Sequence, residues 1–350
     1  MTAITASAPG KLFLLGEYAV LDGAPALLTA VDRRATVTIE PTDDAAWHLH
    51  TPGLSGEGFT LGAGGALPRG LGERELERLR VFEAVRTVVA EAATPAQGLD
   101  ITIDSTAFHR EDGAKLGLGS SAAVAVALTA ALSAAHSLPL DRESIFARAL
   151  SAHRAAQGGT GSGGDVATST FGGLISYSKG ATPVALPWPR ALTLTVVVTG
   201  DGSSTTDLVA RVSAYRAADP AGCGRDIAAL CELARGAEAA LDSPSDLLRL
   251  ASDYFDALMT LDEHAGAGIV SEHHRRLHSL SAGLGGVFKT SGAGGGDVGL
   301  LFTPEGEVTS RVVAAFAEAG AEAVPLAFGE RGLELAGVDT NTQIGSVTAR

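Results

Sequence analysis

In the stretch Lys115-Leu-Gly-Leu-Gly-Ser-Ser-Ala-Ala-Val124, a glycine-rich loop runs directly into a segment of small apolar residues. Glycine lets the backbone approach a phosphate closely, so that several N–H groups can converge on it. The first turn of a helix adds N–H groups without intrahelical partners and the positive end of the helix dipole. The stretch therefore predicts a phosphate-binding loop followed by a helix over residues 120–137.

A plain turn with a helix cap is the alternative interpretation of this loop, because short glycine motifs are common. The loop lacks the Gly-Lys-Ser/Thr of a Walker P-loop, and it does not match the dinucleotide-binding pattern. Ser120 and Ser121 place hydroxyl groups on the first helical turn, where one can bind a phosphate oxygen and the other can ligate Mg²⁺. Lys115, at the start of the loop, offers an ammonium group that can neutralise transferred charge.

Length and charge limit the classes of protein to which the chain can belong. Its 350 residues allow one large domain or two ordinary ones. Aromatic residues make up only 5% of the chain, so its core must consist mainly of Ala, Val and Leu. The net charge of −14 argues against nucleic acid or an anionic membrane as a partner. A small anionic substrate is compatible with it, because a pocket can be locally basic.

Cysteine usage and hydropathy favour a cytoplasmic protein, which we expect to be a monomer or a homodimer. Cys223 and Cys231 form no CxxC pattern and are expected to be incidental or buried thiols. No basic segment leads an apolar run at the N-terminus, so no signal peptide is expected. The run 122–135 is too short to span a bilayer and is expected to be a buried helix.

Hydrophobic periodicity predicts an α+β protein of two lobes, joined near residues 180–192. Residues 51–70, rich in Gly and Pro, are expected to form an exposed loop. Leu76, Leu79, Phe82, Val85 and Val89 recur at helical spacing. The expected strands are 11–15, 35–39, 99–103, 192–198, 286–290, 298–302 and 322–326. The expected helices are 73–93, 120–137, 141–157, 205–217, 225–241, 245–262, 271–283 and 305–319.

Two further segments complete a pattern with the loop at 115–124. Ala8-Pro-Gly-Lys-Leu-Phe-Leu-Leu-Gly-Glu-Tyr18 opens the chain, and Lys289-Thr-Ser-Gly-Ala-Gly-Gly-Gly-Asp297 lies between two expected strands. In order and separation, the three segments resemble the three signature motifs of the GHMP kinases. The resemblance implies a two-lobed α+β fold with an N-terminal mixed β/α nucleotide-binding lobe over residues 1–185. It also implies a C-terminal ferredoxin-like lobe over residues 186–350.

Three details resemble the phosphomevalonate kinase branch of this family. They are Gly16-Glu-Tyr18, Ala152-His-x-x-Ala-Gln-Gly158 and Gly161-Ser-Gly-Gly-Asp-Val166. The resemblance implies that ATP and Mg²⁺ are used to convert 5-phosphomevalonate to 5-diphosphomevalonate, in the mevalonate route to isoprenoids. Mevalonate kinase or another small-molecule kinase of the family is the nearest alternative. A non-catalytic metabolite-binding homologue is the other, and the presence of Lys11 and Asp165 argues against it.

The resemblance also implies roles for individual residues. Asp165 would orient the acceptor oxygen, Lys11 would keep Asp165 ionised, and Lys115 would face the γ-phosphate. Ser121 would ligate Mg²⁺. The residues expected to bind ATP are Lys115, Gly117, Leu118, Gly119, Ser120, Ser121 and Ala122. Those expected to bind the acceptor are Lys11, Glu17, Tyr18, Ser162, Asp165, Ser203, Ser204, Thr205, Gly292, Ala293 and Gly294. Without the resemblance, Asp165 would be interpreted as a turn or cap residue and Lys11 as an exposed strand lysine.

Two departures from the family pattern concern the metal and the acceptor. Mevalonate and homoserine kinases carry a glutamate metal ligand upstream of the aspartate, whereas residues 152–157 hold no carboxylate here. Either phosphates, Ser121 and water hold Mg²⁺, or a ligand comes from elsewhere. The loop 199–205 is shorter than in phosphomevalonate kinases and lacks their tryptophan, which leaves the acceptor open. His153, Arg154 and Arg211 are candidates for additional positive charge at the acceptor.

Overall fold

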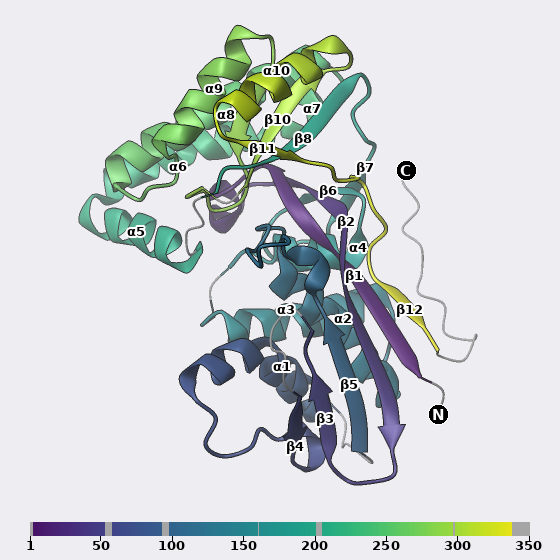
Figure 1. Ribbon diagram of the computed structural model, residues 1–350. Coiled ribbons are helices and arrows are strands. Elements are labelled where there is room, and N and C mark those ends of the chain that lie inside the picture. Colours follow the sequence, from purple (N-terminus) through teal and green to yellow (C-terminus); the bar gives the residue numbers. More distant parts are fainter. Residues whose placement is uncertain are drawn as a thin grey trace. The chain divides into compact units, whose positions relative to one another are not determined.

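The computed structural model describes residues 3–52, 58–92, 98–159, 161–200, 205–296 and 298–337 (Figure 1). The chain divides into two compact units. Unit 1 takes residues 1–11, 30–173 and 328–350, and unit 2 takes residues 12–29 and 174–327. Two long strands, β1 (Ile4–Leu15) and β2 (Ala26–Thr42), contribute residues to both units.

Unit 1 contains a mixed sheet in the order β12-β1-β2-β5-β3-β4. Alternating side chains of β2 are buried, as at Val37 and Ile39, which is the pattern of a strand with one face on the core. Val37 lies opposite Ile103 in the antiparallel pair of β2 with β5, whereas β3 runs parallel to β5. The other strands are β3 (Trp47–His50), β4 (Phe59–Leu61), β5 (Gly98–Asp104) and β12 (Glu334–Ala336).

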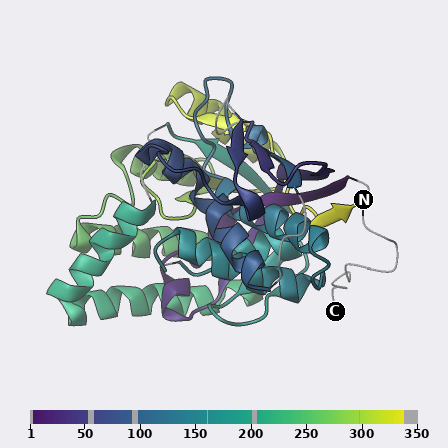
Figure 2. The same cartoon turned by 90° about the horizontal axis from the view of Figure 1, so that it is seen from below.

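In unit 1, the helices α1 to α3 pack against one another (Figures 1 and 2). Helix α2 is buried over most of its length, because its Ala, Val and Leu side chains are small enough for close packing on several sides. Helix α3 begins at the N-cap Asp141, whose carboxylate accepts a hydrogen bond from the Ser144 N–H at 2.8 Å. The helices are α1 (Glu73–Ala92), α2 (Ser120–Ala135), α3 (Arg142–Ala156) and α4 (Gly164–Phe171).

Unit 2 contains an antiparallel sheet in the order β11-β8-β10-β9. The chain passes from β8 through helices to β9 and β10, and then through α10 to β11, which is the β-α-β-β-α-β arrangement of a ferredoxin-like lobe. Phe288, Leu301 and Phe316 form part of its buried core. These strands are β8 (Leu192–Val198), β9 (Val287–Thr290), β10 (Val298–Pro304) and β11 (Glu322–Val324).

The remaining elements of unit 2 are mostly helical. The helices are α5 (Thr205–Ala218), α6 (Pro220–Arg235), α7 (Ala237–Ala240), α8 (Pro244–Ala265), α9 (Glu272–Gly283) and α10 (Glu307–Glu318). Strand β6 (Leu174–Tyr177) pairs with the first residues of β2 and with β7 (Val184–Leu186). Cys223 and Cys231 are buried free thiols, as expected. Within the described ranges, no helix combines the length and the apolar character that crossing a membrane requires.

The predicted α+β class is confirmed, two local expectations are wrong, and one helix was not predicted. The segment 51–70, expected to be a loop, includes the short strand β4, which pairs with β3. Leu76, expected on the apolar face of α1, is 46% exposed, one turn before the first buried residue, Leu79. Helix α4 was missed because its apolar pattern is only 8 residues long.

The predicted lobes, 1–185 and 186–350, stay a prediction. Each compact unit is assembled from several separate segments of the chain rather than by one cut. Strand β12, near the end of the described residues, pairs with β1 and so belongs to unit 1.

Candidate active site

The loop before α2 is shaped by two glycines in the left-handed region. Gly117 has φ +67° and Gly119, the N-cap of α2, has φ +78°. The Leu116 N–H donates to the Phe108 carbonyl at 2.9 Å, and the Lys11 N–H donates to the Leu118 carbonyl at 2.8 Å. The loop is thus tied to its neighbours through its own backbone while it turns into the helix. Such a loop at a helix N-terminus is suited to binding an anion.

The Lys11 side chain passes close to the backbone of Gly119. A Cβ atom built on Gly119 would lie 2.8 Å from Lys11 Cε, so any larger residue there would collide with the lysine. Lys11 is partly buried beside the first turn of α2, whereas Lys115, at the other end of the loop, is exposed. A cation and the positive end of the helix dipole therefore lie close together, and both favour an anionic ligand.

Ser121, His153 and Asp165 form a polar cluster that joins three helices of unit 1. The Ser121 hydroxyl oxygen lies 3.1 Å from Nε2 of His153, and Nδ1 of His153 lies 3.8 Å from Oδ2 of Asp165. Ser121 is in the first turn of α2, His153 is in the last turn of α3, and Asp165 is in the first turn of α4. The side chain of His153 is 2% exposed, whereas that of Asp165 is 23% exposed. The histidine is thus enclosed, and the carboxylate stays open to a ligand.

Asp165 is held by the start of α4. Its Oδ1 accepts a hydrogen bond from the Val166 N–H at 2.9 Å, and the Ser162 hydroxyl accepts one from the Gly164 N–H at 3.2 Å. Arg154 donates from Nη2 to the Ser162 carbonyl at 3.1 Å, which fixes the turn from the side of α3. Asp165 therefore combines the helix-start position of a cap residue with a place in the polar cluster.

The first and third motifs meet in unit 2. The Tyr18 hydroxyl donates to the Ala293 carbonyl at 2.6 Å, and the Ser291 hydroxyl bonds both the N–H and the carbonyl of Phe13. Gly294 has φ +88°, and a Cβ atom there would lie 2.3 Å from the Ile269 carbonyl oxygen. Burial raises the pKa of the Tyr18 phenol well above its usual value, and the carboxylates of Asp262 and Glu17 add to the shift. Tyr18 is therefore a hydrogen-bond donor.

Glu17 and Lys289 form an ion pair in the interior of unit 2. Lys289 Nζ lies 2.6 Å from Glu17 Oε1 and 2.6 Å from the Thr290 carbonyl oxygen. The side chain of Lys289 is 0% exposed and that of Glu17 is 2% exposed. Burial lowers the pKa of the Lys289 ammonium, and the Glu17 carboxylate opposes that shift. The Tyr254 hydroxyl donates to the Glu17 carbonyl at 2.7 Å. In the structure, Glu17 thus serves the packing around the first motif.

The predicted site residues fall into two groups. Unit 1 contains Lys11, the loop and first turn over 115–122, Ser162 and Asp165, and unit 2 contains Glu17, Tyr18 and 292–294. Thr205 is an exposed residue at the start of α5, and Ser203 and Ser204 lie outside the described residues. No group of three or more His, Cys, Asp and Glu side chains in the described part of the chain is placed to hold a metal ion.

Sequence reasoning missed two contacts of the site. His153 was considered only as a possible extra cation, and Lys289 only as the first residue of a motif. The single available signal was that each falls inside a segment that resembles the family. The partner of neither residue can be predicted from residue type, because Ser121 is 32 positions from His153 and Glu17 is 272 positions from Lys289.

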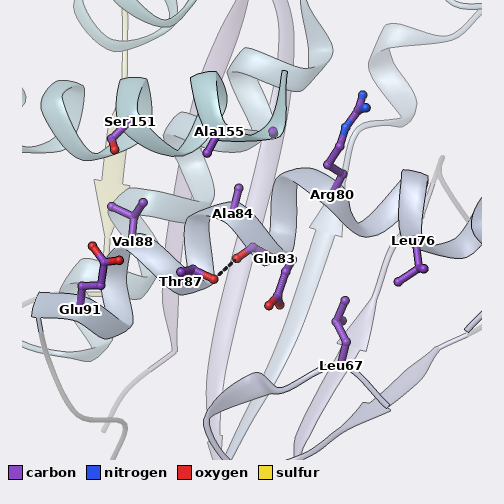
Figure 3. Close-up of a pocket in the computed structure, with 11 residues that line it drawn as sticks. Leu67, Leu76, Arg80, Glu83, Ala84, Thr87, Val88, Glu91, Ser151 and Ala155 are labelled. Atoms are coloured by element: carbon purple, nitrogen blue, oxygen red, sulfur yellow. Dashed lines mark hydrogen bonds between the residues drawn. The ribbon is translucent and has the colours of Figure 1, made fainter. Parts of the chain in front are cut away.

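A groove between α1 and α3 lies apart from the predicted residues (Figure 3). Its apolar lining includes Leu67, Leu76 and Val88, and Arg80 and Glu91 add charge. It contains none of the residues predicted to bind ATP, metal or acceptor.

Comparison with known proteins supplies relatives for this arrangement. Residues 80–173 match the GHMP kinases N terminal domain. A phosphomevalonate kinase of Streptomyces sp. (strain CL190) is 34% identical over 335 residues, covering 85% of this chain and 89% of that protein. A mevalonate kinase of Aeropyrum pernix is 28% identical over 353 residues, covering 95% and 98%.

A solved structure agrees with these sequence matches. Phosphomevalonate kinase of Streptococcus pneumoniae, in complex with phosphomevalonate and AMPPNP, has a TM-score of 0.72 at 20% identity, over 94% of this chain and 100% of that one. At this identity the likeness shows a shared fold, and the Streptomyces relative shows the family. The chain belongs to the GHMP kinase family.

Proposed function

We propose that this chain transfers the γ-phosphoryl group of ATP to 5-phosphomevalonate, giving ADP and 5-diphosphomevalonate. The observation that carries the phosphoryl-transfer part is the polar cluster of Ser121, His153 and Asp165 at the first turn of α2, beside Lys11. The acceptor rests on the Streptomyces phosphomevalonate kinase, which is 34% identical over most of the chain. In the transfer, an acceptor phosphate oxygen bonds to the γ-phosphorus, and the bond to the β,γ-bridging oxygen breaks.

Positioning and charge neutralisation account for most of the catalysis in such a reaction. Backbone N–H groups at the loop and the first turn of α2 would bind the nucleotide phosphates, with the helix dipole adding to the attraction. The ammonium group of Lys11 lies beside this turn and would stabilise charge on the transferring group. Lys115, which is exposed at the other end of the loop, would offer a second ammonium group to the phosphates.

The donor atoms around Ser121 suit Mg²⁺, which prefers oxygen ligands and keeps several waters. The Ser121 hydroxyl and the Asp165 carboxylate are oxygen donors on either side of His153. Together they offer fewer ligands than an octahedral ion needs, so nucleotide phosphates and water would complete the set. When bound, Mg²⁺ would neutralise charge on the β- and γ-phosphates.

Asp165 would act mainly by position and charge when the acceptor is a phosphate. A phosphate monoester is largely ionised near neutral pH, so no proton has to leave the attacking oxygen. The 23% exposed carboxylate of Asp165 would then orient the acceptor and help to hold the cation.

Mevalonate kinase is the second candidate, favoured by the match to the Aeropyrum protein over nearly the full chain. Its acceptor would be an alcohol, whose proton must be removed during the transfer. Asp165 would then act as a general base rather than as a positioning carboxylate. The two candidates therefore differ in the acceptor and in the role of one side chain.

An assay of ADP release, coupled to NADH oxidation, tests the proposal. We would supply ATP, Mg²⁺ and one acceptor at a time: phosphomevalonate, mevalonate, homoserine or galactose. The expected result is turnover with phosphomevalonate that exceeds turnover with each of the others, and its loss in Asp165→Asn. Turnover with mevalonate alone would replace the acceptor, and ADP release with none of the four would overturn the proposed function.

A further inference from the structure

We propose that His153 is a positioning residue, which holds the Ser121 hydroxyl with its hydrogen toward the imidazole and its lone pairs toward the ligand. The proposal rests on the proposed function, because it concerns the site at which ATP and a cation would bind. It assigns to His153 no contact with the reacting atoms. The residue would act only through Ser121 and Asp165.

The contacts of the two imidazole nitrogens define their roles. Nε2 lies 3.1 Å from the Ser121 oxygen and 3.3 Å from Nε2 of Gln157, one turn later on the chain. A side-chain amide nitrogen only donates hydrogen bonds, so the imidazole atom that faces it must accept. Nδ1 points to the Asp165 carboxylate at 3.8 Å, where a hydrogen on nitrogen is favoured electrostatically. We infer that the neutral form of this imidazole carries its hydrogen on Nδ1.

This tautomer sets the direction of the Ser121 hydroxyl. With Nε2 as an acceptor, the Ser121 hydroxyl can only donate to it, and it shares the single lone pair of this nitrogen with the more distant Gln157 amide. Its oxygen then keeps both lone pairs for other partners, such as a cation. In the opposite tautomer, Nε2 would carry the hydrogen and donate it to the Ser121 oxygen, which would occupy one of these lone pairs. His153 thus prepares Ser121 as a pure acceptor.

Burial of the His153 ring restricts it to this orientation. His153 is 2% exposed and is flanked by the starts of α2 and α4, so its ring has little freedom to turn. Ser121 and Asp165 are only partly buried and stay accessible to a ligand. The enclosed His153 ring therefore connects the accessible side chains of Ser121 and Asp165, which are 165 − 121 = 44 positions apart in sequence.

The tautomer can be read directly by NMR, without nucleotide, metal or acceptor. The chain would be labelled with ¹⁵N-histidine, and two-bond ¹H–¹⁵N correlations would be recorded at about pH 8, where most imidazoles are neutral. The His153 signals are those that vanish in His153→Gln. We expect the pattern of an Nδ1–H imidazole. An Nε2–H pattern would overturn the proposal.

The effect on the cation can be measured by calorimetry with AMPPNP, in the presence and absence of Mg²⁺. We expect His153→Ala to lower the Mg²⁺-dependent gain in affinity by about 10- to 100-fold, the usual range for residues that orient a metal ligand. Metal-free binding should change little. His153→Gln, whose amide oxygen can still accept from Ser121, should recover part of the gain.

A double-mutant cycle with Ser121→Ala separates orientation from general damage. If His153 acts through Ser121, the double variant should be no weaker than Ser121→Ala alone. The proposal would be overturned if the losses of Mg²⁺-dependent affinity in the two single variants multiplied in the double variant. It would also be overturned if His153→Ala weakened metal-free binding of AMPPNP as much as binding with Mg²⁺. His136→Gln is the matched control, since His136 follows α2 at its other end and stacks on Trp47, and it should leave binding unchanged.

The two proposals can fail independently. Neither the NMR experiment nor the calorimetry uses an acceptor. A chain without phosphomevalonate turnover would refute the proposed function, while the His153 tautomer and the cycle would still be decided. If His153→Ala does not fold, the wild-type spectrum and the His153→Gln variant still decide the result.

Discussion

Two clusters built from the family motifs, one in each unit, use charge in opposite ways. In unit 1, the carboxylate of Asp165 is 23% exposed and stands 3.8 Å from its histidine. In unit 2, Glu17 and Lys289 are 2% and 0% exposed and stand 2.6 Å apart. The first arrangement leaves a carboxylate oxygen available to a ligand. In the second arrangement, the two buried charges pair with each other.

The buried pair has a structural consequence for the site. Lys289 also donates to the Thr290 carbonyl, and the Tyr254 hydroxyl binds the Glu17 carbonyl. These bonds fix the backbone at the end of the first motif, next to Tyr18, and at the start of the third motif, before the loop at 291–296. The comparison therefore predicts that the first cluster affects rate and the second affects stability.

The largest effect is expected at the open carboxylate. Asp165→Asn keeps the shape of the side chain and its bond from the Val166 N–H but removes the charge. We expect turnover to fall by about a hundredfold or more, while the melting temperature stays close to that of the wild type. Steady-state kinetics and differential scanning calorimetry would measure the two quantities. Asp141→Asn, at the N-cap of α3, is the control, and a similar loss of rate there would show that Asp165 is only a cap.

The buried pair should show the reverse pattern. Lys289→Met leaves the Glu17 carboxylate in the interior without its cation, which typically lowers the free energy of unfolding by about 3–5 kcal/mol. Thermal and urea unfolding would measure the loss. The double variant Glu17→Gln with Lys289→Met removes both charges and should recover most of the stability. If the single variant unfolded like the wild type, the pair would have no structural role.

A smaller effect is expected where the third motif packs against the loop after α8. Gly294→Ala puts a Cβ atom 2.3 Å from the Ile269 carbonyl oxygen at φ +88°, so the loop must shift. We expect a loss of about 1–3 kcal/mol in the free energy of unfolding and a higher KM for the acceptor. Gly266→Ala, also at positive φ but in open space, isolates the backbone strain. Equal losses in both variants would mean that the close approach is unimportant.

Periodicity was sufficient for the longer elements. Helices α2 and α3 and strand β8 occur close to their predicted bounds, because many consecutive residues repeat one pattern. Short elements escaped prediction because few residues define their pattern. Helix α4, which carries Asp165, is such a case, and so are the three-residue strands β4 and β7.

The sequence indicates which residue types belong to the candidate site but not which side chains they contact. Glycine at 119 and the serines at 120 and 121 indicate phosphate binding locally, within one turn. The pairing of Ser121 with His153, and of Glu17 with Lys289, depends on how distant helices and strands pack, which one sequence does not specify. The burial that distinguishes an open from a closed carboxylate likewise arises only in the folded chain.

The most direct test of the central claim is ³¹P NMR of the chain with ATP, Mg²⁺ and 5-phosphomevalonate. We expect the monoester signal of the acceptor to be replaced by the two coupled signals of a diphosphate as ADP appears. The same mixture with Asp165→Asn should change far more slowly. Release of inorganic phosphate without a diphosphate product, or an unchanged acceptor signal in the wild type, would contradict the account.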